Sequence, residues 1–162
     1  MEVRTRPKAR TRRFDSPEQE AYLAIWRTYD RLKEIEDAFF AEWDLTAQQY
    51  NVLRLLRAAL PAGMPTLALV GKLVSRAPDV TRMLDKLESR ELIERQRTKA
   101  DRRSVIVSIT SAGTVLLDVM AEPLKDYHDR QLGHMSQQDL KAMMVLLRTA
   151  AKPHEPEGSS WI

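Results

Sequence analysis

The chain has 162 residues, of which 43% are hydrophobic and 30% are charged, and this length allows one domain with a real core. It has no cysteine, which excludes a disulfide framework, a thiolate metal site and a cysteine redox sensor. No apolar run approaches the roughly 18 residues of a membrane span, and no apolar stretch follows the basic N-terminus, so we expect a cytoplasmic protein without a secretory signal.

Charge is distributed unevenly, although the net charge is only +3. Residues 1–13 carry a net charge of +5, residues 72–103 carry +4, and the remainder of the chain is acidic. Positive charge gathered at two places is typical of a protein that binds nucleic acid. A solvated basic face is the simpler alternative.

The two ends of the chain lack a helical or strand pattern. Residues 1–15 are expected to form a disordered basic arm. Such an arm can follow DNA phosphates or enter the minor groove, but for this segment alone a solubilising tail is the interpretation that we favour. Residues 152–162 contain two prolines, a glycine and two serines, so we expect a flexible tail.

A first long helix is predicted over residues 16–42. Ser16 is the cap, Pro17 is the first helical residue and Gln19 stands at the capping-box position. The helix carries more apolar side chains than an isolated surface helix needs, among them Tyr22, Ile25, Trp26, Tyr29, Leu32, Phe39 and Phe40. We therefore expect it to pack against another element or another subunit.

A second helix opens at residues 45–46 with a capping box from Thr46 to Gln49. Two prolines and a glycine within residues 61–65 break the chain. A short helix is predicted at about residues 66–74, where Gly71 is expected to allow close packing. Its inward side chains are expected to be Leu67, Val70, Leu73 and Val74.

Residues 78–110 predict a helix, two short strands and a basic tip between the strands. Val80, Leu84 and Leu87 fall at helical spacing and make an apolar face. Asp79, Arg82 and Lys86 lie on the opposite, polar face. A strand begins at Ile93, the polar and basic segment 98–103 follows, and Val105, Val107 and Ile109 alternate with the period of a second strand.

Two further helices complete the predicted fold. The first covers about residues 112–131, and Pro123 within it is expected to produce a kink. The second ends near residue 151 and begins with a capping signal at Ser136. Its inward side chains are expected to be Leu140, Met143, Met144 and Leu147.

Several separate motifs agree in order and spacing with a known family. They are Ser75-Arg76-Ala77-Pro78-Asp79-Val80-Thr81-Arg82, Leu84-Asp85-Lys86-Leu87-Glu88, Asp101-Arg102-Arg103 and Val107-Ser108-Ile109-Thr110-Ser111-Ala112-Gly113. Together they resemble the winged helix-turn-helix of MarR-family transcriptional regulators, and the likeness covers roughly residues 16–150. The resemblance implies a mainly α fold with a small antiparallel β wing, in which N- and C-terminal helices form a dimer.

The resemblance also implies that residues 16–151 of this chain form a single domain. The winged helix would span about residues 45–110, and residues 16–42 and 112–151 would supply the dimerisation helices. One departure is Glu91, where the family usually has glycine after the recognition helix. Glu91 either takes a left-handed turn at a cost of about 1 kcal/mol or ends the helix differently.

The polar face of the predicted recognition helix supplies the candidate DNA contacts, because such a helix meets base edges in the major groove. The candidates are Arg76, Asp79, Thr81, Arg82 and Lys86. Arg82 is best placed to reach guanine, although an ion pair with Asp79 or Asp85 is the structural alternative. Lys86 is expected to meet phosphate.

By resemblance, Arg103 is the wing arginine that enters the minor groove, and Asp101 pairs with it to hold the loop. Lys99 and Arg102 would add phosphate contacts. A plain turn-stabilising ion pair is the alternative for Asp101 and Arg103. A narrow minor groove favours arginine because its negative potential is enhanced.

The resemblance also implies a small, often aromatic or phenolic effector that binds between the dimerisation helices and the DNA-binding part. Trp26, Tyr29, Trp43 and Tyr50 are candidates to line its pocket, but an aromatic core is the interpretation that we favour for each. No cofactor and no metal are expected, because His128, His134 and His154 lack a ligand spacing.

We therefore expect a homodimeric, DNA-binding transcriptional regulator that acts as a repressor at a pseudo-palindromic operator. Its partners would be double-stranded DNA, a second copy of the chain and an effector, with no membrane. An enzyme is not expected, since no phosphate-binding glycine loop, nucleophile elbow or HExxH motif is present. A ligand-independent activator and a winged-helix protein-interaction module without specific DNA binding remain as alternatives.

Overall fold

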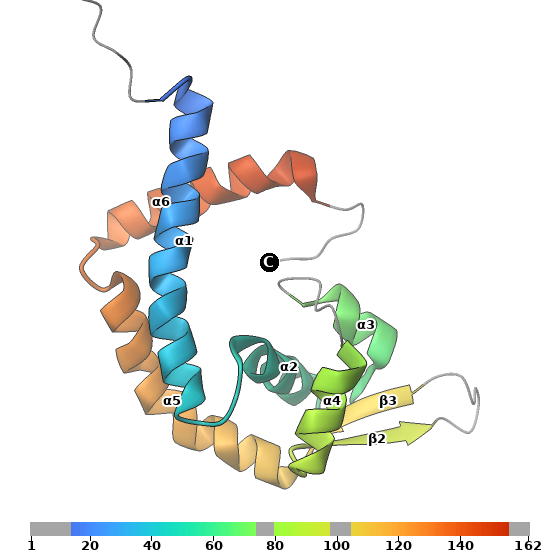
Figure 1. Ribbon diagram of the computed structural model, residues 1–162. Coiled ribbons are helices and arrows are strands. Elements are labelled where there is room, and N and C mark those ends of the chain that lie inside the picture. Colours follow the sequence, from blue (N-terminus) through green and yellow to red (C-terminus); the bar gives the residue numbers. More distant parts are fainter. Residues whose placement is uncertain (1–13, 74–79, 98–104, 156–162) are drawn as a thin grey trace, which may run out of the picture. The chain divides into compact units, whose positions relative to one another are not determined.

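The computed structural model describes residues 14–73, 80–97 and 105–155. In chain order its elements are α1 (Pro17–Ala41), α2 (Ala47–Ala58), β1 (Met64–Pro65), α3 (Thr66–Gly71), α4 (Val80–Ser89), β2 (Ile93–Arg97), β3 (Val105–Ile109), α5 (Ser111–Leu132), α6 (Gln137–Ala151) and the short 3-10 helix η1 (Lys152–His154) (Figure 1). The expected mainly helical fold with a small antiparallel sheet is confirmed. The chain divides into two compact units, Met1–Glu34 and Ile35–Ile162.

The sheet has a strand that the sequence analysis did not predict. Its order is β1-β3-β2, with β3 antiparallel to both neighbours. Ile93 pairs with Ile109, and Met64 pairs with Val107 on the other side of β3. β1 has only two residues, and Pro65 cannot donate a backbone hydrogen bond, so the strand lies at an edge of the sheet.

The core of the second unit joins α2 and α4 to the sheet. Leu53, Leu56, Leu87 and Val107 are fully buried, and Leu84 is 1% exposed. Burial of one such aliphatic side chain contributes about 1.5–3 kcal/mol. The predicted apolar face of the recognition helix is therefore confirmed, and it fixes which face of α4 remains in solvent.

The predicted inward face of the third helix is wrong at Leu67 and Val70, whereas Leu73 packs against the core as expected and Val74 lies outside the described residues. Leu69 is the buried residue of α3, whereas Leu67 is 86% exposed and Val70 is 38% exposed. Gly71 has open space where a Cβ would stand, so it does not serve close packing. A helix of six residues has fewer than two turns, and its orientation is set by docking onto the sheet rather than by its own periodicity.

Helix α6 buries none of its residues. Leu140 and Met143 are half-buried, whereas Met144 and Leu147, which were also expected to face inward, are 46% and 44% exposed. Val145 and Leu146 are more exposed still. Contiguous exposed apolar side chains of this kind are typical of interaction surfaces.

In the N-terminal unit, α1 likewise presents large exposed apolar side chains. They are Tyr22, Leu23, Ile25, Trp26 and Tyr29. Hydrogen bonds at its start confirm the predicted cap, since the amide of Gln19 donates to Ser16 Oγ at 3.1 Å. None of the helices that the structure describes is both long and apolar enough to cross a bilayer.

Candidate nucleic-acid interface

Helix α4 separates a buried face from a polar one. Leu84 and Leu87 are in the core, while Thr81, Arg82 and Lys86 are exposed on the opposite side. Three side chains predicted to contact DNA thus share one solvent-facing surface of a helix that is anchored from behind. This is the geometry that reading the major groove requires.

Strand β2 supplies a partner for the acidic side chains of α4. Arg95 Nε donates to Glu88 Oε2 at 2.9 Å, and Arg95 Nη2 donates to Asp85 Oδ1 at 2.6 Å. The hydrogen bond from Arg95 lowers the pKa of Glu88, and the same contact raises the pKa of Arg95. Asp85, which was a predicted ion-pair partner of Arg82, pairs with Arg95.

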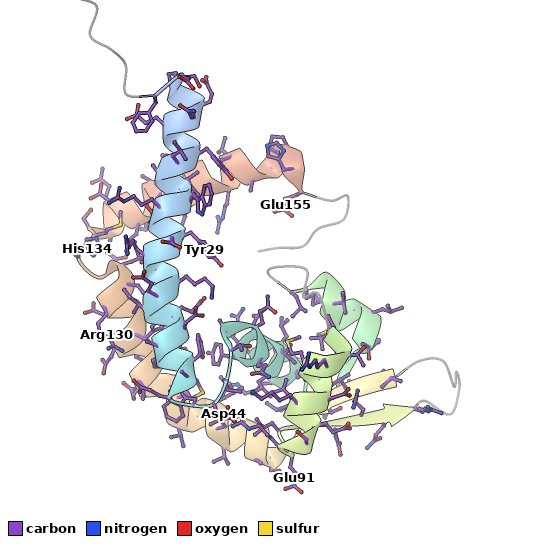
Figure 2. The ribbon with its side chains drawn as sticks, in the orientation of Figure 1. Tyr29, Asp44, Glu91, Arg130, His134 and Glu155 are labelled. Atoms are coloured by element: carbon purple, nitrogen blue, oxygen red, sulfur yellow. The ribbon has the colours of Figure 1, made fainter. Side chains whose placement is uncertain are left out.

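Glu91 adopts the left-handed conformation, with φ +57°. The amide of Leu92 donates to the carbonyl of Leu87 at 3.0 Å, and the amide of Glu91 donates to the carbonyl of Glu88 at 2.8 Å. These two bonds form a Schellman motif, the usual left-handed end of a helix. Glu91 therefore occupies a position that normally takes glycine, and Figure 2 shows its side chain at the end of α4, pointing outward.

Thr110 ties this helix end to the start of α5. Its hydroxyl donates to the carbonyl of Glu91 at 2.6 Å and accepts from the amide of Gly113 at 3.1 Å, while its own amide donates to the carbonyl of Leu92 at 3.1 Å. A Cβ on Gly113 would overlap the Leu92 carbonyl oxygen and Ile109. These contacts explain why threonine and glycine stand at positions 110 and 113 of the Ile-Thr-x-x-Gly motif. We name residues 90–92 and 110–113 the α4–α5 junction.

Arg90 joins the other side of the same helix end to the turn after α1. Its guanidinium donates to the backbone carbonyls of Asp44 and Trp43, the latter at 3.2 Å. The Asp44 carboxylate lies 3.7 Å from Arg90 Nη1 and 3.6 Å from Lys86 Nζ. Asp44 also has a left-handed backbone, with φ +48°, and Figure 2 shows it close to the beginning of α2.

An open groove of about 600 Å³ runs between α4 and the N-terminus of α2. It is lined by Thr46, Gln48, Gln49, Arg82, Met83, Asp85, Lys86 and Ser89. The predicted capping box is confirmed here, because Thr46 Oγ1 accepts from the amide of Gln49 at 3.2 Å and Gln49 Oε1 accepts from the amide of Thr46 at 2.9 Å. The N-terminus of α2 and the cations Arg82 and Lys86 favour an anion in this groove, whereas the Asp85 carboxylate opposes one.

Six of the predicted DNA-contact residues lie outside the described residues. They are Arg76, Asp79, Lys99, Asp101, Arg102 and Arg103. Their roles stay predictions. Thr81, Arg82 and Lys86 are the predicted contacts that the structure places, and it brings Arg82 and Lys86 to one groove.

The four aromatic residues proposed for an effector pocket differ in their surroundings. Trp43 and Tyr50 are half-buried and pack against the core of the second unit. Trp26 and Tyr29 belong to the N-terminal unit and are 58% and 59% exposed, so the core role favoured for them from sequence is wrong. Trp43 Nε1 is a buried donor with no hydrogen-bond partner among the groups that the structure describes.

A cluster of aromatic rings that the sequence analysis did not identify surrounds Tyr127 of α5. Tyr127 stacks on Phe39 with ring centroids 4.7 Å apart, and Phe40 lies 5.2 Å from Tyr50. Burial raises the pKa of Tyr127 to about 12, and the charge of Glu36 adds to the shift. Within the described part of the chain, no group of three or more His, Asp or Glu side chains could hold a metal ion.

Residues 45–105 match the family model described as MarR family. Transcriptional regulator HosA of Escherichia coli O127:H6 is 30% identical over 128 residues, covering 75% of this chain and 93% of HosA. A MarR transcription factor from Planctomyces limnophilus has a crystal structure that is 47% identical, with a TM-score of 0.67 and coverage of 85% of this chain and 99% of that one.

The fold is also that of a mutant of E. coli MarR, solved in complex with operator DNA. That structure is 23% identical, with a TM-score of 0.72 and coverage of 81% of this chain and 93% of that one. The matched relatives are regulators of transcription, and the winged helix described above is the part that the family model covers. The chain belongs to the MarR family of transcriptional regulators.

Proposed function

We propose that this regulator is a homodimeric repressor that binds a pseudo-palindromic operator through α4 and the wing. The observation that carries the proposal is the exposed row of Thr81, Arg82 and Lys86 on a helix whose other face is buried. Arg82 would contact a guanine, which is worth about 1–3 kcal/mol of discrimination, and Lys86 would contact a phosphate. A mutant of E. coli MarR with the same fold is complexed with operator DNA, which supports DNA binding by this chain.

The exposed apolar side chains support the homodimer. In α6, Val145 and Leu146 are 60% and 68% exposed. In α1, Trp26 and Tyr29 are 58% and 59% exposed. Apolar helices of this kind are covered by a partner in soluble proteins. A second copy of the chain is the occupant that two-fold operator symmetry requires. A dimer bound across a promoter would repress transcription by excluding the polymerase. A regulator of this kind acts in the cytoplasm, where the DNA is.

The experiment is selection of bound duplexes from a random DNA pool, with the mass of the complex measured alongside. We expect an enriched inverted repeat with half-sites about one helical turn apart, bound by a dimer. Arg82→Ala should then weaken operator binding about tenfold or more and relax the preference at one base position. Lys125→Ala, which removes an exposed cation of α5, is the matched control.

Other outcomes of the same experiment discriminate the alternatives. Binding without any enriched sequence, and with a steep salt dependence, would leave only nonspecific phosphate contacts. No binding even at low salt would favour the protein-interaction module. If operator binding activates rather than represses a reporter gene, the activator alternative is correct.

A small-molecule effector is the second part of the proposal, and the unpartnered Trp43 Nε1 favours it. A buried donor without an acceptor is costly, and a carboxylate or phenolic oxygen would satisfy it. Hydroxylated aromatic acids should therefore quench tryptophan fluorescence and weaken operator binding together. Loss of both effects in Trp43→Phe would support the site, and quenching that persists in this variant would exclude it.

A further inference from the structure

We propose that Asp44 sets the DNA affinity of this regulator by competing with the DNA backbone for Lys86. The inference rests on the proposed function, because it assumes that Lys86 of α4 contacts a DNA phosphate. The Asp44 carboxylate of the same chain would compete with that phosphate for Lys86. The carboxylate of Asp44 would hold the Lys86 ammonium when DNA is absent, and a phosphate would replace it when DNA binds.

The first observation is the position of the pair at the edge of the groove. Lys86 lines the groove, and Asp44 precedes the groove-lining Thr46 by two residues. Lys86 Nζ lies 3.6 Å from Asp44 Oδ1, and the two side chains are 52% and 74% exposed. An incoming phosphate therefore has access to the ammonium, and the pair is weak enough to be displaced.

The second observation is that Arg90 does not depend on the carboxylate. Its guanidinium already donates to the backbone carbonyls of Trp43 and Asp44, and its side chain is only 28% exposed. These bonds hold the end of α4 against the turn after α1 whether or not the Asp44 side chain is charged. Removal of the charge should therefore release Lys86 without moving the helix.

The third observation is that Asp44 can be replaced without disturbing its backbone conformation. Asp44 has φ +48°, and asparagine is one of the few residues that take this conformation readily. Asp44→Asn keeps the backbone and the side-chain shape while removing one negative charge. Asp118→Asn is the matched control, because Asp118 is an exposed carboxylate of α5 that pairs with Arg57 at 2.9 Å and does not line the groove.

The measurement is duplex binding as a function of salt, for an operator and for an unrelated duplex of the same length. Asp44→Asn should bind both about two- to fivefold more tightly for each subunit that contacts the duplex, because one exposed ion pair of ordinary strength per subunit no longer opposes binding. The gain should be equal for the two duplexes, since phosphate contacts carry no sequence information. The slope of log K against log salt should stay about the same, because Lys86 neutralises one phosphate in the complex with or without the Asp44 carboxylate.

A second variant tests the route through Lys86. In the Lys86→Gln background, Asp44→Asn should give little further gain, because the cation for which the two anions compete is gone. Unchanged or weaker binding of Asp44→Asn would overturn the inference, as would an equal gain in Asp118→Asn or a gain confined to the operator. If the wild-type protein fails to bind either duplex at low salt, the proposed function itself is wrong and the inference falls with it.

Discussion

Replacement of Glu91 by glycine should stabilise the protein. Glu91 has φ +57°, a conformation that costs a residue with a Cβ about 1–2 kcal/mol. Glycine avoids that cost but gives the unfolded chain more freedom, which offsets about 0.5–1 kcal/mol. The bonds at this position use the backbone amide and carbonyl of residue 91, so Glu91→Gly keeps them. The expected net gain is about 0.5–1 kcal/mol.

The assay is urea unfolding at one protein concentration, because the stability of a self-associating protein depends on concentration. The midpoint should rise without a change in slope, and the melting temperature should increase by about 1–4 °C. Glu91→Ala is the control, since it removes the same carboxylate but keeps a Cβ in the left-handed region. If the alanine variant gains as much as the glycine variant, the gain comes from charge and the strain argument is wrong.

Three further predictions concern the wing, the ion pair between α4 and β2 and the α4–α5 junction. Arg103→Ala should weaken operator binding at least about tenfold without unfolding the protein, and an unchanged titration midpoint would remove the wing from the mechanism. Glu88 has a lowered pKa in the folded state, so its stabilisation is complete above the usual carboxyl pKa and is lost as the pH falls through the lowered value. Glu88→Gln should therefore lose less stability than the wild type on acidification below about pH 5, as measured by denaturant unfolding at each pH; parallel curves would contradict this. Gly113→Ala should destabilise by about 1–3 kcal/mol in thermal unfolding, because its Cβ overlaps the carbonyl of Leu92, whereas Gly71→Ala should be tolerated.

Local signals in the sequence predicted local structure well. The capping box of Thr46 and Gln49 and the alternation of β3 each depend on residues within a few positions of one another, and both are confirmed. The apolar spacing of Leu84 and Leu87 correctly gave the buried face of α4, because ten residues are enough to define a stripe.

What the sequence did not reveal depends on contacts between distant residues. No local pattern distinguishes Arg90 from other surface arginines, yet its partners lie 46 and 47 positions earlier. In the sequence Arg95 is likewise one of several charged residues in a predicted strand, whereas in the structure it pairs with Asp85 and Glu88 of α4. The prediction that Leu67 and Val70 face inward was wrong for a related reason, because a six-residue helix takes its orientation from the sheet on which it packs.

The α4–α5 junction has a mechanical consequence. A flexible hinge between the recognition helix and the helix that follows the wing would need a residue with free φ and ψ angles at position 91. Here the position holds a glutamate, and Thr110 fixes the carbonyls of both Glu91 and Leu92. Bending at this point is therefore costly, and we expect α4, the base of the sheet and the first turn of α5 to rotate as one rigid block. In the proposed dimer, any signal that changes the separation of the two operator-reading surfaces would have to turn the whole block.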